Sequence, residues 1–254
     1  MRLFDTHAHL LSEKFDEDRR TMIEALPSQG VIGFIEVGTD LQNSEQVQRL
    51  AEGSDYIWAA IGVHPHDAGD ALSDYLDGLT EIAKRPKVVA IGEIGLDYFY
   101  DFSPRDVQKK AFERQLELAR RLKLPVIIHM REATQDTLDI LREHKGLRGV
   151  MHCFSGSPET AEICLGLGLH ISFTGSVTFK NARKVAEAAA AVPLDRLMAE
   201  TDCPYLSPEP VRGRRNDPAN VRYVIEKLAE IKGLTADEMA EINIQNAKEF
   251  FAIK

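Results

Sequence analysis

The chain has 254 residues, of which 44% are hydrophobic and 28% are charged, and 31 Lys and Arg against 40 Asp and Glu give a net charge of −9. These fractions indicate a globular domain with a sizeable core, and they exclude a disordered chain, a collagen-like repeat and a disulfide-rich miniprotein. The acidic balance argues against tight non-specific coating of nucleic acid, although a local basic groove is compatible with it.

Targeting and redox signals are few. No window reaches the roughly 18 to 20 apolar residues of a membrane helix, and Asp5 precedes any apolar core of a signal peptide. We therefore expect a cytoplasmic protein with no membrane association, and nothing in the sequence indicates an obligate protein partner. Cys153, Cys164 and Cys203 are an odd number without a CxxC pair, so we expect reduced thiols.

Short apolar or β-rich segments recur along the chain. The predicted strands are residues 2–6, 31–37, 56–63, 87–92, 125–129, 149–153, 169–174 and 195–200. Their starts lie 20 to 38 residues apart, which is the spacing of repeated βαβ units, and their continuous apolar character is typical of parallel strands buried on both faces. Residues 105–123 show the clearest helical periodicity between strands. The tail is predicted to form two helices, around 217–232 and 235–251, separated by Gly233.

Eight βα repeats in a chain of this length predict the α/β fold class and, within it, a single (β/α)8 TIM barrel over residues 1–254 with the tail helices closing it. A doubly wound open sheet is the alternative. It is less favoured because no GxGxxG follows the first strand, and because polar residues stand at nearly every strand end whereas an open sheet uses one crevice. No linker or low-complexity tract marks a second domain.

A pair of histidines follows the first predicted strand. Because side chains alternate along a strand, Asp5, His7 and His9 share one face, and the two imidazoles can point at one ion. Alone, this HxH pattern fits two hydrogen-bonded polar side chains as well as it fits a ligand pair. Its position favours ligands, since polar side chains inside a barrel are costly unless they are hydrogen-bonded or metal-bound.

Titratable residues also stand at the ends of five later strands. They are His64 in GVHPH, Glu93 in GEIGLD, His129 in PVIIHMR, His152 in VMHCF and Asp202 in AETDCP. The carboxyl ends of the strands build the active site of a TIM barrel. Five unrelated buried groups at these ends would be improbable, because buried unpaired charges are rare.

The candidate metal ligands are too many for one ion. They are His7, His9, Glu93, His129, His152 and Asp202. A single catalytic zinc typically takes three protein ligands, so this set predicts two divalent cations with a carboxylate such as Glu93 between them. Imidazole-rich ligation favours Zn²⁺, Mn²⁺, Co²⁺ or Fe²⁺, whereas Mg²⁺ usually prefers oxygen, so ligand counting leaves the ion open. Asp202 is the expected proton acceptor for an activated water, and with Glu93 it forms the predicted catalytic pair.

The motifs together resemble the TatD family of metal-dependent deoxyribonucleases, within the amidohydrolase-like group of barrels. The matching stretches are LFDTHAHL, GVHPH, VAIGEIGLDY, PVIIHMREA, HCFSGS, LDRLMAETDCPYLSP and RGRRNDPANV. They cover nearly the whole chain. One departure is Leu11, which stands where the family often has an acidic or amide residue; this affects loop contacts and not the metal centre.

The resemblance has implications for ligands and activity. It implies that one ion is held by His7, His9, Glu93 and Asp202, and the second by Glu93, His129 and His152. It implies 3′→5′ exonuclease action on single-stranded DNA, for some members also on RNA, usually with Mg²⁺. The expected partner is therefore a nucleic acid substrate.

Arg131 and Tyr98 are candidates for substrate contacts near the fourth and fifth strands. Arg131, two residues beyond His129, can bind phosphate oxygens with its guanidinium fork; the alternative is a salt bridge with Glu132 or Asp136. Tyr98 can stack on a terminal base, and equally it can pack against neighbouring rings.

His64, Arg212 and Arg215 complete the predicted substrate contacts. His64 can line the pocket or support a ligand. Arg212 and Arg215 belong to the compact cationic run RGRR, which can contact a nucleic acid backbone or simply be solvated.

Two competing interpretations remain. An amidohydrolase acting on a small amide, lactone or phosphotriester would use the same kind of centre. No lysine suited to carboxylation stands at the end of the fourth strand, where Glu93 lies, and this favours the nuclease. A non-catalytic, metal-stabilised scaffold is less favoured because structural metal sites tend to be closed.

Overall fold

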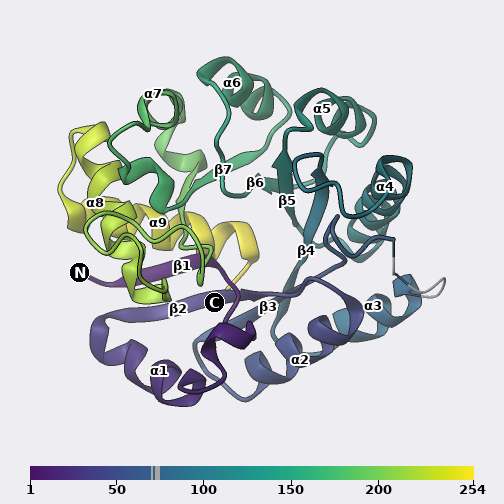
Figure 1. Cartoon of the computed structure of the whole chain (residues 1–254), viewed down its shortest axis with the longest axis horizontal. Helices are drawn as coiled ribbons and strands as arrows, with labels where there is room; N and C mark the ends of the chain where they lie inside the picture. Colours follow the sequence, from purple (N-terminus) through teal and green to yellow (C-terminus); the bar gives the residue numbers. More distant parts are fainter. Residues whose placement is uncertain (70, 72–74) are drawn as a thin grey trace. The chain divides into compact units, whose positions relative to one another are not determined.

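The structure is a computed structural model that describes residues 1–69, 71 and 75–254 (Figure 1). Its strands are β1 (Leu3–Ala8), β2 (Val31–Val37), β3 (Ile57–Ile61), β4 (Val88–Asp97), β5 (Val126–Arg131), β6 (Gly149–Met151), β7 (His170–Phe173) and β8 (Leu197–Ala199). Its α-helices are α1 (Arg19–Ala25), α2 (Leu41–Glu52), α3 (Tyr75–Ala83), α4 (Arg105–Leu122), α5 (Thr134–Glu143), α6 (Pro158–Gly166), α7 (Arg183–Ala191), α8 (Val221–Lys232) and α9 (Ala236–Phe251).

The strands are neighbours in chain order within one eight-stranded sheet, and helices follow them along the chain. This is the topology of an α/β TIM barrel, and it confirms the predicted fold class. Each predicted strand is present. No helix in the described residues is both long and apolar enough to cross a membrane. No disulfide joins Cys153, Cys164 and Cys203 in the described part of the chain.

The strand bounds differ from the predicted ones where the site residues lie. β1 continues to Ala8, and β4 continues past Glu93 to Asp97. The register between β4 and β5 shifts between Ile91 and Ile94, so Glu93 lies in an irregular part of the strand. Such an irregularity interrupts the alternation of side chains and can redirect one of them. Glu93 is therefore presented from within a strand and not from the loop after it.

The chain divides into two compact units, which are described separately. Unit 1 comprises Met1–Ile35, Cys153–Gly166 and His170–Lys254, and unit 2 comprises Glu36–His152 and Leu167–Leu169. Unit 1 contains β1, β7 and β8, and unit 2 contains β3 to β6. The organisation of residues 1–254 as a single domain stays a prediction.

In unit 1 the tail helices pack against β1 and β8. The buried side chain of Asn243 on α9 donates from Nδ2 to the Phe4 carbonyl at 2.8 Å and accepts the Ala199 N–H at 2.8 Å. Ala8 forms a parallel bridge to Cys203, just beyond β8. Gly233, at φ 68°, ends α8 in the left-handed region as the sequence predicts. α9 thus holds β1 beside the segment that carries Asp202.

In unit 2, α4 fixes the carboxyl ends of two strands with buried glutamines. Gln115 accepts the Val63 N–H at 2.7 Å and donates to the Val63 carbonyl at 3.0 Å. Gln108 accepts the Asp97 N–H at 2.9 Å and donates to the Asp97 carbonyl at 3.1 Å. Buried backbone groups need such partners, so α4 positions the segment that follows β3 and the last residue of β4.

Candidate metal centre

Unit 1 brings His7, His9 and Asp202 together. The Nε2 atoms of His7 and His9 lie 3.0 Å apart. The Asp202 Oδ1 atom lies 3.6 Å from His9 Nε2 and 4.0 Å from His7 Nε2. Two imidazole nitrogens and a carboxylate oxygen are a donor set that suits a divalent transition metal. We call these three residues the unit 1 cluster.

The backbone around the unit 1 cluster is held by Asp5. Its buried carboxylate accepts the Thr201 hydroxyl at 2.5 Å, the Thr201 N–H at 2.8 Å and the His7 N–H at 3.2 Å. Burial raises the pKa of Asp5 well above its usual value, although the hydrogen bonds from Thr201 act against it. The Asp202 N–H donates to the His7 carbonyl at 3.0 Å. Asp5 therefore orders the strand end that carries the ligands.

Unit 2 brings three imidazoles to one oxygen of Glu93. Glu93 Oε1 lies 2.7 Å from His129 Nδ1, 3.0 Å from His152 Nε2 and 3.4 Å from His64 Nε2. Burial opposes ionisation of Glu93, but His152 and His129 outweigh it, so the pKa of this carboxyl lies well below its usual value. An ionised carboxylate among imidazole nitrogens also suits a divalent cation. We call Glu93, His129 and His152 the unit 2 cluster.

Asp97 orients His129 and was not predicted. Its Oδ2 atom lies 3.1 Å from His129 Nε2 and 2.9 Å from His66 Nε2. Burial opposes ionisation of Asp97, but the hydrogen bonds from His129 and from the Tyr100 backbone outweigh it and lower its pKa. Carboxylates that accept the second ring N–H of a metal-binding histidine fix its orientation. The signal was present in the sequence, because Asp97 ends the GEIGLD motif and His66 ends GVHPH.

His64 contacts Glu93 in a defined tautomer. Its Nδ1 atom accepts the His66 backbone N–H at 3.2 Å, and burial lowers the pKa of the imidazole to about 4, although Glu93 acts against this shift. In the neutral ring the proton then lies on Nε2, the atom that faces Glu93. A protonated nitrogen has no lone pair for a metal. The geometry thus favours support of Glu93 among the roles the sequence left open for His64.

Arg131 and Tyr98 have partners other than those weighed from the sequence. The Arg131 guanidinium lies over the ring of Phe99, 4.1 Å from its centroid, and 4.7 Å from that of Tyr100. The Tyr98 hydroxyl donates to Asp136 at 2.6 Å, and the Arg105 guanidinium lies 4.2 Å from the Tyr98 ring centroid. The hydroxyl of Tyr98 is therefore bonded to Asp136, and its ring is in contact with Arg105. Arg131 packs against the neighbouring rings of Phe99 and Tyr100.

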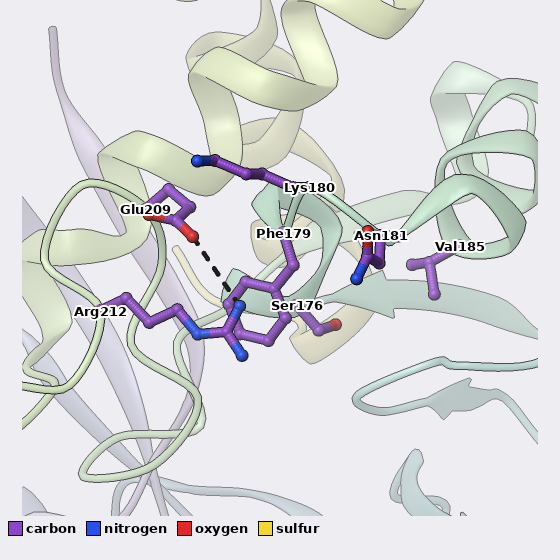
Figure 2. A pocket seen from close by; sticks show the side chains of 8 residues that line it. Ser176, Phe179, Lys180, Asn181, Val185, Glu209 and Arg212 are labelled. Atoms are coloured by element: carbon purple, nitrogen blue, oxygen red, sulfur yellow. Dashed lines mark ion pairs between the residues drawn. The ribbon is translucent and has the colours of Figure 1, made fainter.

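Arg212 lies in a pocket of about 380 Å³ within unit 1 (Figure 2). The lining residues are Ser176, Phe179, Lys180, Asn181, Ala182, Val185, Glu209 and Arg212. Its guanidinium lies 3.9 Å from the Phe179 ring centroid and 3.8 Å from Glu209 Oε1. Arg215 is bonded differently, because its two terminal nitrogens donate to the Asp18 carboxylate at 2.8 and 2.6 Å.

The barrel topology and the two clusters of histidines and carboxylates define a metal-dependent hydrolase. The family model described as TatD related DNase matches residues 4–252. The chain belongs to this family, which confirms the resemblance drawn from its motifs.

Individual relatives match over their full lengths. The uncharacterised metal-dependent hydrolase YabD of Bacillus subtilis (strain 168) is 47% identical over 253 residues, covering 99% of each chain. The 3′-5′ ssDNA/RNA exonuclease TatD of Rahnella sp. (strain Y9602) is 38% identical over 259 residues, covering 99% of this chain and 98% of the relative. The solved structure of the TatD homologue YJJV from Escherichia coli K12 has a TM-score of 0.93 at 33% identity, covering 100% of this chain and 99% of that one. These similarities support the TIM-barrel fold and the assignment as a hydrolase.

Proposed function

We propose that this hydrolase is an exonuclease that removes nucleotides from the 3′ end of single-stranded DNA, and that it also accepts RNA. The observation that carries the proposal is the unit 1 cluster, in which the carboxylate of Asp202 lies beside two imidazoles and is still 16% exposed. An acid that water can reach beside a metal-ligand pair suits hydrolysis more than structural binding. The activity printed for the Rahnella relative supports the choice of substrate.

Two divalent cations are the proposed cofactors, with Mg²⁺ expected from the family resemblance and Mn²⁺ or Zn²⁺ as alternatives. The unit 1 cluster and the unit 2 cluster would each hold one ion, and the resemblance assigns Glu93 to both. When bound, such cations lower the pKa of water and stabilise negative charge on phosphate oxygens.

Residues of the chain would transfer the proton, bind the phosphate and position Glu93. Asp202 would accept the proton of the attacking water, whose oxygen bonds to phosphorus while the bond to the departing 3′-oxygen breaks. Arg131 and Arg212 would bind phosphate oxygens, since a guanidinium can offer two parallel N–H groups. His64 would keep Glu93 in place through its Nε2–H. Contacts of Tyr98 and Arg215 with the substrate stay predictions.

The test is product analysis on single- and double-stranded DNA and RNA labelled at the 5′ end. We expect a ladder of products shortened from the 3′ end, its loss after chelation and its return with Mg²⁺ or Mn²⁺. Asp202→Asn should lower the rate by about 100-fold to 10,000-fold. Asp195→Asn is the matched control, because this carboxylate is 78% exposed and precedes β8.

Three results would contradict the proposal. They are digestion that survives chelation, a wild-type rate in Asp202→Asn, and products shortened from the 5′ end. Hydrolysis of a panel of amides or lactones, with DNA left intact, would instead support the competing amidohydrolase.

A further inference from the structure

Three exposed aromatic side chains gather in the segment between β4 and α4. Phe99 is 57% exposed, Tyr100 47% and Phe102 68%. Single exposed apolar residues are normal, but a contiguous group on a surface marks an interaction site. We call Phe99, Tyr100, Phe102 and the neighbouring Arg131 the aromatic platform.

The rings of the aromatic platform are ordered by contacts with one another. Tyr100 and Phe102 are stacked, with centroids 5.2 Å apart and planes at 27°. Phe99 meets Tyr100 edge to face at 5.0 Å. Arg131 is the strand partner of Asp97 in the register of β4 and β5, which brings its guanidinium over Phe99 and Tyr100. The ring surface is thus formed before any ligand binds, which lowers the entropy cost of binding.

The aromatic platform is attached to the unit 2 cluster through Asp97. One oxygen of Asp97, Oδ1, accepts the backbone N–H groups of Phe99 and Tyr100 at 2.9 Å each. The other oxygen lies 3.1 Å from His129 Nε2. The His66 ring, also bonded to Asp97, lies 5.3 Å from Tyr100 and 4.9 Å from Phe102. A ligand on these rings would therefore lie next to the unit 2 cluster.

We propose that the aromatic platform stacks the unpaired bases of a single-stranded nucleic acid and that Arg131 binds the phosphate beside them. The inference rests on the proposed function and specifies which residues bind the bases and the phosphate of the substrate. Flat ring faces accept every base, whereas the bases of a duplex are already stacked and paired, so this surface selects single strands without reading sequence. A guanidinium whose central carbon lies over an aromatic ring can still present N–H groups to a phosphate.

The platform can be tested by binding without cleavage. In the presence of chelator, fluorescence anisotropy compares labelled oligothymidylate with a strand of equal length built from abasic sites. Both strands carry the same phosphates, so only the bases differ. We expect the wild type to bind oligothymidylate at least about fivefold more tightly than the abasic strand.

The variant Phe99→Leu/Tyr100→Leu/Phe102→Leu should lose this preference and bind both strands as the wild type binds the abasic one. Leu194→Ala, another exposed apolar residue, is the control and should keep the preference. If the triple variant fails to fold, judged by thermal unfolding, Phe102→Leu alone must still reduce the preference, since this ring is the most exposed of the three.

Two outcomes would overturn the inference, and they are distinguishable. If the wild type digests single-stranded DNA but binds oligothymidylate and the abasic strand equally, the base-stacking role of the aromatic platform is refuted and the proposed function is not. A wild type that cleaves no phosphodiester with any divalent cation removes the proposed function, and the platform as a substrate site falls with it.

Discussion

His129 is held between two carboxylates, with Nδ1 2.7 Å from Glu93 Oε1 and Nε2 3.1 Å from Asp97 Oδ2. Because Asp97 accepts the Nε2–H, the lone pair of Nδ1 can be directed at a cation beside Glu93. Asp97 also anchors the first rings of the aromatic platform. One buried carboxylate thereby couples a proposed metal ligand to the proposed base-binding surface.

Asp97→Asn should weaken metal binding without unfolding the protein. The amide keeps the size of the side chain but loses the charge that orients His129, and such losses typically lower metal affinity by about 10- to 100-fold. Calorimetric titration of chelator-treated protein with Mn²⁺ measures the change. Asp139→Asn is the control, because this carboxylate on α5 is 51% exposed and its bonds to Gln135 and Arg142 stay within that helix. Equal Mn²⁺ affinity in wild type and Asp97→Asn would refute the orienting role.

Metal affinity should also depend on pH through His129. Burial opposes protonation of this imidazole, but hydrogen bonds to Asp97 and Glu93 outweigh it and raise its pKa above 6.5 in the metal-free protein. A cation must displace that proton, so below the raised pKa affinity should fall by up to about tenfold per pH unit. We expect Mn²⁺ affinity to go on rising with pH above the range in which a histidine with the ordinary pKa of about 6.5 titrates.

The same titration in Asp97→Asn separates this cause from others. Removing the partner charge should return the pKa of His129 toward its ordinary value, so the affinity should level off at a lower pH. An unchanged profile in the variant would mean that another group controls the dependence.

The strands, which the structure confirms, and the candidate site residues, which stay predictions, were inferred from one physical feature of the sequence. Parallel strands of this fold class are apolar on both faces, so a titratable side chain at a strand end stands out locally, as His152 does after VM. Asp97 did not stand out, because its role depends on His129 and His66, which lie 32 and 31 residues away. The contact of Arg131 with Phe99 depends on the register between β4 and β5, which no local pattern contains.

The contacts of Asn243, which stabilise the fold, could not be predicted from local sequence patterns either. Its two partners, Phe4 and Ala199, lie 239 and 44 residues away, so a helical sequence pattern gives no hint of them. Asn243→Ala would remove the hydrogen bonds that this buried side chain makes with the Phe4 carbonyl and with the Ala199 N–H. A hydrogen bond of this kind typically contributes about 0.5 to 1.5 kcal/mol, so we expect the loss of two to lower the free energy of unfolding by about 1 to 3 kcal/mol.

Urea unfolding of the metal-free protein measures this loss. Gln245→Ala is the control on the same helix, because its side chain is exposed and donates only to Glu249. Asn243→Ala should also weaken metal binding at the unit 1 cluster, since α9 holds β1 beside β8. A change below about 1 kcal/mol would show that another contact joins these strands.

Arg212 and Arg215 should differ in their effect on DNA binding, although they lie in one cationic run. The Arg212 side chain is 55% exposed beside the pocket of Figure 2 and has a single long ion pair, 3.8 Å from Glu209. Arg215 already donates both terminal nitrogens to Asp18. A phosphate would have to compete with that carboxylate. We therefore expect Arg212→Ala to weaken binding of an oligonucleotide more than Arg215→Ala does.

The salt dependence of oligonucleotide affinity tests this difference. A lysine or arginine that contacts one phosphate contributes about 0.7 to the slope of log affinity against log salt concentration on single strands. Arg212→Ala should reduce the slope by about that amount, and Arg215→Ala by less. Arg183→Ala on α7 is the control, because this arginine is 90% exposed and bonded to Glu187. If these arginines contact the strand away from the reacting phosphate, the Arg212→Ala/Arg215→Ala variant should cleave a dinucleotide at the wild-type rate. An equal loss on the dinucleotide and on the oligonucleotide would place these arginines at the reacting phosphate and not along the strand.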